Sequence, residues 1–176
     1  MTIRYIASIA AVAALVAGCA SMTSTPFDGA RATAKLEPTR GNRAAGTVTF
    51  VERMGKVAVI AEVTGLAPNQ EHGFHVHEKG DCSSGDGMSA GGHFNPDGKP
   101  HGPQGAPHHA GDMPSLKADA NGNATASFTL DDVTVAAGTK SLLGRGLIVH
   151  KDPDDYKTQP TGNAGARLAC AVIRAG

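Results

Sequence analysis

The chain has 176 residues, close to the size of one domain, and 40% of them are apolar, which excludes a disordered polar tract. Its 16 basic and 16 acidic residues leave no net charge, so it is not a nucleic-acid binder that relies on bulk basicity. Composition also excludes a coiled coil, a collagen and a polytopic membrane protein, and the 23 glycines and eight histidines indicate a loop-rich, histidine-rich globular domain.

Residues 1–18 are predicted to be a secretory signal peptide. Arg4 precedes an apolar stretch, residues 6–17, which is interrupted only by Ser8. This stretch is too short for a settled membrane-spanning helix, which needs about 20 residues, and it suits the hydrophobic region of a signal sequence. The Val-Ala-Gly that precedes Cys19 resembles a bacterial lipobox, in which the cysteine thiol is acylated and becomes the new N-terminus. The alternative is an ordinary signal peptide with an incidental cysteine.

We therefore expect three segments: a signal peptide at residues 1–18, a flexible tether at residues 19–31 and a single domain at residues 32–176. Lipid on Cys19 would anchor the domain in the periplasm or at the cell surface, and this anchor is the one membrane contact that we expect. Ala20 follows the cysteine, and because no aspartate stands there, the sequence is compatible with sorting to an outer membrane.

Past the tether, apolar and polar residues alternate with the period of β-strands. Residues 47–51 and 56–63 flank Met54-Gly55, and residues 116–119 and 124–130 flank Asn-Gly-Asn at 121–123, so each pair is predicted to form a hairpin. Residues 146–150 and 168–174 are two further predicted strands. With no helical period outside the signal, about eight short strands predict an antiparallel sandwich or flattened barrel.

Two long stretches interrupt this pattern, residues 82–114 and 151–166. Both are rich in glycine and proline and carry no strand signal. Loops of this length in a small domain are either disordered or functional, and the histidines of the first stretch favour a loop held by metal.

Cysteine usage points to one disulfide. If Cys19 carries lipid, Cys82 and Cys170 remain as a pair, 88 residues apart, in an oxidising compartment where a bridge persists. The alternative for Cys82 is a thiolate metal ligand, given the histidines around it.

The histidines predict a metal site. His75 and His77 lie two residues apart in a strand-like run, so both imidazoles leave the same face of the strand. The other candidates around them are His93, His101, His108, His109, Asp112 and His150. Imidazole suits copper and zinc, and a carboxylate can complete a tetrahedral zinc site.

Four blocks of this sequence closely resemble the copper–zinc superoxide dismutases. They are residues 73–78 (Gly-Phe-His-Val-His-Glu), 92–96 (Gly-His-Phe-Asn-Pro), 109–112 (His-Ala-Gly-Asp) and 162–170 (Gly-Asn-Ala-Gly-Ala-Arg-Leu-Ala-Cys). Together with the strand that ends at His150, they extend the resemblance over nearly the whole chain after the tether. The resemblance implies an all-β fold, an eight-stranded Greek-key β-barrel (a flattened sandwich) with two long functional loops.

The same resemblance implies one copper and one zinc in each subunit. The implied copper ligands are His75, His77, His93 and His150. The implied zinc ligands are His93, His101, His109 and Asp112, with His93 bridging the two metals as an imidazolate. The implied activity is dismutation of superoxide, the substrate, to oxygen and hydrogen peroxide by a redox-cycling copper beside a structural zinc, so the chain is expected to be an oxidoreductase.

Arg167 and His93 are the implied catalytic residues. A guanidinium beside an open copper position attracts and orients a small anion, and Lys157 can add to the field. His93 is implied to take up and return a proton during the cycle. The loop at residues 151–166 is shorter than in many eukaryotic members and lacks their glutamates.

Two more residues are implied to support the ligands. Asp154 is implied to link a copper histidine, His75, with a zinc histidine, His101, and such partners set the orientation of the imidazole rings. His72 is implied to brace the backbone near the site without binding metal. His108 matches no ligand and is interpreted as a loop histidine.

Two other functions were weighed. A non-catalytic copper/zinc-binding or storage module would lack a ligand or saturate the copper, whereas every implied ligand and Arg167 are present. A zinc hydrolase would need an open zinc position and a general base. Assembly stays open between a monomer and a homodimer, because the ten residues between Cys82 and His93 exceed the length found in eukaryotic dimers.

Overall fold

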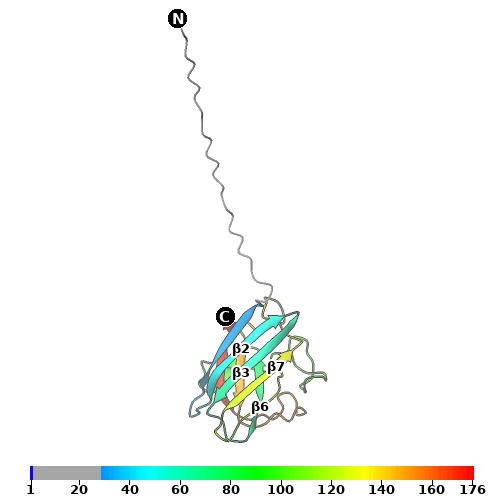
Figure 1. The fold of residues 1–176 in the computed structure, drawn as a ribbon. Coiled ribbons are helices and arrows are strands. Elements are labelled where there is room, and N and C mark those ends of the chain that lie inside the picture. The colour runs from blue at the N-terminus through cyan, green and yellow to red at the C-terminus, as the bar shows by residue number, and fades with distance from the viewer. Residues whose placement is uncertain (2–28) are drawn as a thin grey trace.

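The computed structural model describes Met1 and residues 29–176 (Figure 1). The predicted signal peptide, Cys19 and most of the predicted tether therefore lie outside the described residues. Among the residues that are described, no helix is long and apolar enough to cross a membrane.

Residues 29–176 form ten strands and one short 3₁₀ helix. They are β1 (Arg31–Pro38), β2 (Ala45–Arg53), β3 (Lys56–Thr64), β4 (Glu71–His72), β5 (Phe74–His77), η1 (Met88–Ala90), β6 (Leu116–Lys117), β7 (Ala124–Leu130), β8 (Gly146–His150), β9 (Arg167–Val172) and β10 (Arg174–Ala175).

The main sheet is antiparallel, with the order β5-β8-β9-β1-β2-β3-β7, and β10 pairs with β1 beside β9. Figure 1 shows β2, β3 and β7 side by side on the near face, with C-terminal strands behind them. Strand β1 therefore lies between β9 and β2, and the sheet curls into a flattened barrel. The predicted fold class, all-β with a Greek-key barrel, is confirmed.

The interior of the barrel follows from the alternation along the strands. Strand β1 buries Ala32, Ala34 and Leu36 and exposes the residues between them. Phe50 and Phe74 are fully buried in the same core. Strand β1 was not predicted from the sequence, although residues 31–36 alternate as clearly as those of β3.

The first predicted hairpin is confirmed, and the second is wrong. Met54 and Gly55 both have positive φ, 50° and 74°, as the two-residue turn between β2 and β3 requires. The Asn-Gly turn also forms, with Gly122 donating to the Asp119 carbonyl at 3.1 Å, but β6 pairs with β4 and β7 pairs with β3. Leu66 donates to the Gly122 carbonyl, so the turn is tied to the chain that follows β3 and passes from the small sheet to the large one.

The predicted strand at residues 168–174 is interrupted at Ile173. The amide of Ile173 donates to the Arg145 carbonyl at 2.9 Å, and its carbonyl accepts from Gly144 at 2.9 Å. These bonds turn the backbone away from β1, so β9 pairs with β1 at Glu37 and β10 pairs with it again at Ala32.

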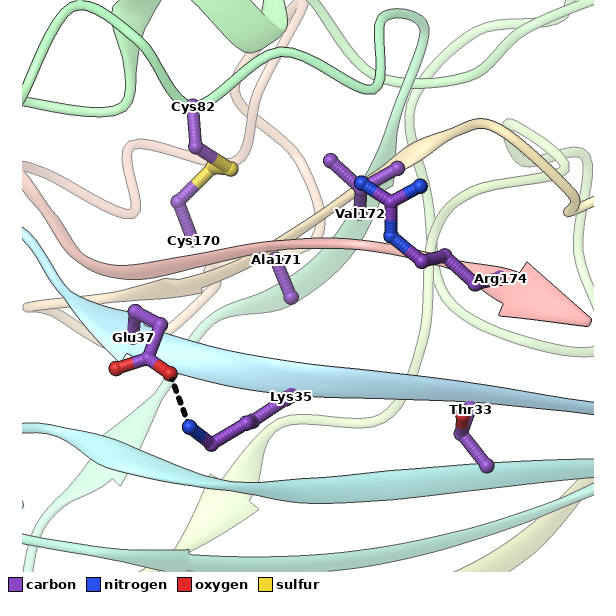
Figure 2. A pocket seen from close by; sticks show the side chains of 8 residues that line it. All are labelled: Thr33, Lys35, Glu37, Cys82, Cys170, Ala171, Val172 and Arg174. Atoms are coloured by element: carbon purple, nitrogen blue, oxygen red, sulfur yellow. Dashed lines mark ion pairs between the residues drawn. A yellow bond between two sulfur atoms is a disulfide. The ribbon is translucent and has the colours of Figure 1, made fainter. Parts of the chain in front are cut away.

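A disulfide joins Cys82 to Cys170, with Cα atoms 5.9 Å apart. The predicted bridge is confirmed, and because both sulfurs are used in it, Cys82 is not a metal ligand. Figure 2 shows the bridge at one side of a surface hollow that Lys35 and Glu37 of β1 also line. The bridge holds the start of the long loop at residues 82–114 against β9.

Candidate metal centre

Four buried histidines converge between the two long loops and the edge of the sheet. Strand β5 carries His75 and His77, β8 ends at His150, and His93 reaches β5 from the first loop through an isolated bridge with His77. One ring nitrogen of each lies within 4.8 Å of the others. We call these residues the first cluster.

The outer nitrogens of the first cluster decide which nitrogens face inward. His75 Nε2 donates to Asp154 Oδ2 at 2.8 Å, and His77 Nδ1 donates to the Gly91 carbonyl at 2.9 Å. His150 Nδ1 donates to the Gly165 carbonyl at 3.2 Å, which leaves its Nε2 3.4 Å from His77 Nε2. The inward atoms are therefore Nδ1 of His75 and Nε2 of the other histidines.

Two of these inward atoms are buried without a partner. His75 Nδ1 and His93 Nε2 make no hydrogen bond within the described chain. A buried polar atom without a hydrogen bond is costly, and native proteins rarely keep one without a reason. A metal ion held by the four nitrogens supplies that reason, so the donor set fits a metal that prefers imidazole.

Burial keeps three histidines of the first cluster neutral. It lowers the pKa of His75 to about 4, against the opposing hydrogen bond with Asp154, and it lowers the pKa of His77 and of His150 well below the ordinary value. Neutral imidazole is the form that binds metals, so these three side chains need no deprotonation at neutral pH.

A second cluster consists of His93, His101, His109 and Asp112, all buried. His93 Nδ1 lies 2.8 Å and His109 Nδ1 lies 3.4 Å from Asp112 Oδ1. His101 Nδ1 lies 3.0 Å from Asp112 Oδ2 without the alignment of a hydrogen bond. Zinc with bonds of 2.0–2.1 Å in a tetrahedron separates its ligand atoms by about 3.3 Å. Donor types and spacings thus fit a closed tetrahedral zinc site.

In the second cluster, Asp112 is held in its ionised form and His101 in its protonated form. Burial favours neutral Asp112, but the close contact with His101 and the hydrogen bond from His93 outweigh it and hold the pKa of Asp112 below its ordinary range. Burial also opposes charge on His101, yet the close Asp112 carboxylate and the hydrogen bond to Asp154 raise its pKa to about 9. The metal-free cluster therefore carries a proton on His101, which a cation would replace.

The two clusters share His93. Its Nδ1 belongs to the second cluster and its Nε2 to the first, so a single imidazole separates the two groups of ligand atoms. The ring stacks on His75, with centroids 4.0 Å apart.

Asp154 connects the clusters a second time. Its carboxylate accepts from His75 Nε2 at 2.8 Å and from His101 Nε2 at 2.9 Å, and it also accepts from the Tyr156 amide at 2.7 Å. Burial disfavours its charge, but the two histidines outweigh this and keep the pKa of Asp154 below its ordinary range. Gly162 has a φ of +64°, and a Cβ there would collide with this carboxylate and with His101.

Arg167 begins β9 beside the first cluster. Its guanidinium donates to the carbonyls of Gly87 and Gly91, each at 2.6 Å. Half-burial lowers the pKa of Arg167 while Asp86 opposes this, and its positive charge contributes to the low pKa of His77 and His150.

The remaining predicted residues lie outside both clusters. His72 Nδ1 donates to the His150 carbonyl at 2.8 Å, and His108 Nδ1 donates to the Ala106 carbonyl at 2.6 Å. Gln159 was not predicted from the sequence. Its Oε1 accepts from the His101 amide at 2.8 Å, and its Nε2 donates to the His101 carbonyl at 2.9 Å. Nothing in the sequence around Gln159 marks it. Gly91 was also missed, although a Gly-Gly pair before His93 signals a backbone with special geometry.

The family model described as copper/zinc superoxide dismutase (SODC) matches residues 44–173. Superoxide dismutase [Cu-Zn] 2 of Aquifex aeolicus (strain VF5) is 41% identical over 168 residues, which cover 91% of this chain and 96% of the relative. Superoxide dismutase [Cu-Zn] of Paramecium bursaria Chlorella virus 1 is 45% identical, over 73% and 71% of the two chains.

Two solved structures are also similar. The crystal structure of the clock protein EA4 has a TM-score of 0.76 and 39% identity, over 85% of this chain and 96% of that one. A double mutant of a SOD-like protein from Bacillus subtilis has a TM-score of 0.74 and 35% identity, over 81% and 96%.

Proposed function

Because the chain belongs to the copper/zinc superoxide dismutase family, we propose that its two clusters hold the two metals of that chemistry. The chain is an oxidoreductase that converts superoxide to oxygen and hydrogen peroxide, with copper and zinc as cofactors. In our proposal copper binds His75, His77, His93 and His150, and zinc binds His93, His101, His109 and Asp112. The observation that carries this assignment is the pair of inward nitrogens, on His75 and His93, that are buried without a partner.

Two superoxide ions and two protons give one oxygen and one hydrogen peroxide. Copper held by the first cluster would supply the one-electron redox chemistry. We assign proton transfer to His93, because zinc would occupy its Nδ1 beside Asp112 and would leave Nε2, on the side of the first cluster, to hold a proton. A positioned imidazole with access to substrate acts in this way as a general acid.

Arg167 attracts and orients the substrate. Its side chain is fixed by two backbone carbonyls and its charge is felt at the first cluster, so it presents a preorganised cation to a small anion. Arginine is not a metal ligand, and its role therefore separates catalysis from metal storage.

The metal assignment is tested by removing one ligand of each cluster. His77→Ala should lower bound copper and abolish superoxide dismutation in a pulse-radiolysis assay, while zinc is retained. Asp112→Ala should lower zinc before copper. His108→Ala is the matched control, because this histidine lies in the same loop outside both clusters, and both metals should stay. Equal copper content in His77→Ala and in the unaltered chain would contradict the assignment.

We also propose that the protein is exported and anchored by lipid. In this proposal residues 1–18 are a signal peptide, Cys19 is lipidated, residues 19–31 are a tether, and the domain of residues 32–176 acts in the periplasm or at the cell surface, on an outer membrane. The support is the lipobox-like sequence and the disulfide, which persists in an oxidising compartment. Mass spectrometry of the mature N-terminal peptide should find a lipidated Cys19, and an unmodified N-terminus beyond that residue would overturn the proposal.

A further inference from the structure

The turn between β2 and β3 carries an exposed apolar side chain between two basic ones. We call residues 53–56 (Arg-Met-Gly-Lys) the hairpin tip. All four are exposed, and Met54 is fully so, at 100%. Beside the tip, Val51 and Ala58 pair across the two strands and line a surface hollow of about 200 Å³ together with Met54 and Thr129. Ile60, 44% exposed, continues the apolar character along β3.

Met54 serves neither the turn nor the core. Its φ of 50° lies in the left-handed region, where glycine and asparagine are favoured and a bulky side chain is uncommon. The side chain lies outside the barrel, and the solvent face of an antiparallel sheet normally carries polar residues. An apolar side chain kept in this position is available for a surface outside the protein.

The tether enters the domain at the hairpin tip. The amide of Glu52 donates to the Ala30 carbonyl at 2.8 Å, and Arg31 pairs with Val51. The residues that lead into β1 therefore lie beside the end of β2, next to the turn that carries Met54. Gly29 lies so close to the Glu52 carbonyl that no Cβ would fit there. Figure 1 shows the start of β1 at the same end of the barrel as the turn between β2 and β3.

The tether is short. Ten Cα–Cα steps separate Cys19 from Gly29, and these steps can span at most about 35 Å. A lipid on Cys19 would therefore keep the hairpin tip close to the membrane surface, at a high local concentration.

Charge at this end of the barrel suits an anionic surface. Arg53 and Lys56 flank Met54. The Glu52 carboxylate accepts from the amides of Val135 and Ala136 at 2.7 and 2.9 Å. Lys56 pairs with Asp131 at 3.1 Å, but both side chains are exposed and an exposed ion pair contributes little, so Lys56 can exchange this partner for a phosphate. Basic residues around an apolar side chain are the pattern that binds the interface of anionic membranes.

The metal clusters lie at the other end of β1. Pro38 pairs with Ala169, and the hydroxyl of Thr39 donates to the Arg167 carbonyl at 2.6 Å. Seven residue steps of strand separate Arg31 from Pro38, about 23 Å. With the hairpin tip on a membrane, Arg167 faces away from it, where an anionic surface does not repel superoxide.

We propose that the hairpin tip docks on a bilayer that contains anionic phospholipids, with Met54 inserted among the headgroups and Arg53 and Lys56 on the phosphates. This orientation rests on the lipid attachment at Cys19 proposed above. It makes the barrel a domain of fixed orientation, with the hairpin tip toward the lipid and the metal clusters toward solution.

The chain contains no tryptophan, so one substitution creates a unique fluorophore. The full mature Met54→Trp protein is bound to vesicles of phosphatidylglycerol and phosphatidylcholine, with and without brominated lipids. Its emission should move to shorter wavelength and be quenched by the brominated lipids. Met88→Trp is the matched control, because Met88 is 60% exposed and lines a hollow with Arg167 at the far end of the barrel. Its emission should be the same with either lipid.

A third variant tests the charges. Arg53→Glu/Lys56→Glu in the Met54→Trp background should lose the shift and the quenching on anionic vesicles. Emission of Met54→Trp that is unchanged by anionic vesicles, or equal quenching of Met54→Trp and Met88→Trp, would overturn the proposal. The mass of the N-terminal peptide is measured on the same sample, so a missing lipid is recognised separately. If the N-terminal peptide carries no lipid, the Met54→Trp protein is mixed with an excess of vesicles. Its emission shift and quenching then decide the outcome in the same way. Thermal unfolding measured in parallel shows that each variant is folded.

Discussion

His77 and Arg167 are joined through one backbone atom. The carbonyl oxygen of Gly91 accepts from His77 Nδ1 at 2.9 Å and from the Arg167 guanidinium at 2.6 Å. A proposed copper ligand and the proposed substrate-binding cation therefore share a fixed support. Gly91 has a φ of +75°, in the left-handed region that glycine adopts without strain, so the position favours glycine.

Arg167→Ala should slow dismutation while both metals stay bound. One charge-assisted contact contributes roughly 1.5–3 kcal/mol, which corresponds to a loss of about tenfold or more in rate. The rate of the unaltered chain should also fall with added salt, because the field is screened within about 10 Å at 0.1 M. Arg53→Ala removes the same charge at the far end of the barrel and should change the rate little. Pulse radiolysis at matched copper content measures both, and equal rates for Arg167→Ala and the unaltered chain would reject the role proposed for Arg167.

Asp154→Asn should weaken both metals at once. The Asp154 carboxylate has two accepting oxygens, whereas an Asn side chain has one, so either His75 or His101 loses its hydrogen-bond acceptor. Loss of such a partner lowers metal affinity about 10–100-fold. Competition with a chelator, followed by metal analysis, measures the effect. Asp155→Asn is the control, because this neighbouring carboxylate is exposed and bonds only within its own loop, to Lys157 and Thr158. A variant that lost neither metal would show that the link is dispensable.

Gly162→Ala should cost more than backbone strain alone. Gly98 has nearly the same positive φ, 63° against 64°, but a Cβ at Gly98 meets nothing within 4 Å. Gly98→Ala therefore reports the strain of the left-handed backbone, about 1 kcal/mol, and Gly162→Ala adds the collision with Asp154 and His101. Thermal unfolding and zinc content should fall further in Gly162→Ala than in Gly98→Ala, and equal values would contradict the collision.

Replacement of both bridge cysteines by serine should loosen the site as well as the fold. Loss of a native disulfide from a small exported domain typically costs 2–5 kcal/mol. The loop that Cys82 secures also supplies the Gly87 and Gly91 carbonyls that hold Arg167, so dismutation should slow even below the melting temperature. Thermal unfolding and rate are measured on the same metal-loaded sample. Unchanged melting with a normal rate would count against this coupling.

The metal-stripped protein should be most stable near pH 6.5. Burial lowers the pKa of His75 to about 4 and also lowers the pKa of His77 and His150, so below about pH 6.5 the unfolded chain binds protons that the folded chain does not, and the free energy of unfolding falls. Asp112 and Asp154 raise the pKa of His101 to about 9, so the folded chain keeps a proton between pH 6.5 and 9, and stability falls again in that range. Denaturant titrations at several pH values measure the profile. Bound metals replace the titrating protons, so the loaded protein should show a flatter one.

Local patterns predicted much of the fold and a histidine metal site, and the family resemblance implied which residues form each cluster. The two-residue spacing of His75 and His77 indicated a common face, and the structure has both side chains on β5 in the first cluster. Met54-Gly55 predicted its hairpin correctly, because the partner strands are adjacent in the chain. The hairpin predicted around the Asn-Gly turn at residues 121–123 was wrong. A turn reverses the direction of the chain but does not determine which strand pairs with which, and β7 pairs with β3.

By itself, the sequence determined the composition of the site: the residue types, their order, and the alternation that sends imidazoles to one side of a strand. Only the tertiary structure decided which nitrogen of each histidine faces inward, because that choice depends on partners remote in the chain, such as Asp154 for His75 and Gly165 for His150. It also placed the Gly91 carbonyl between His77 and Arg167, which are 90 residues apart in the sequence. Backbone carbonyls are the same in every residue, so a sequence carries no mark of the one that will orient a ligand; folding brings it there.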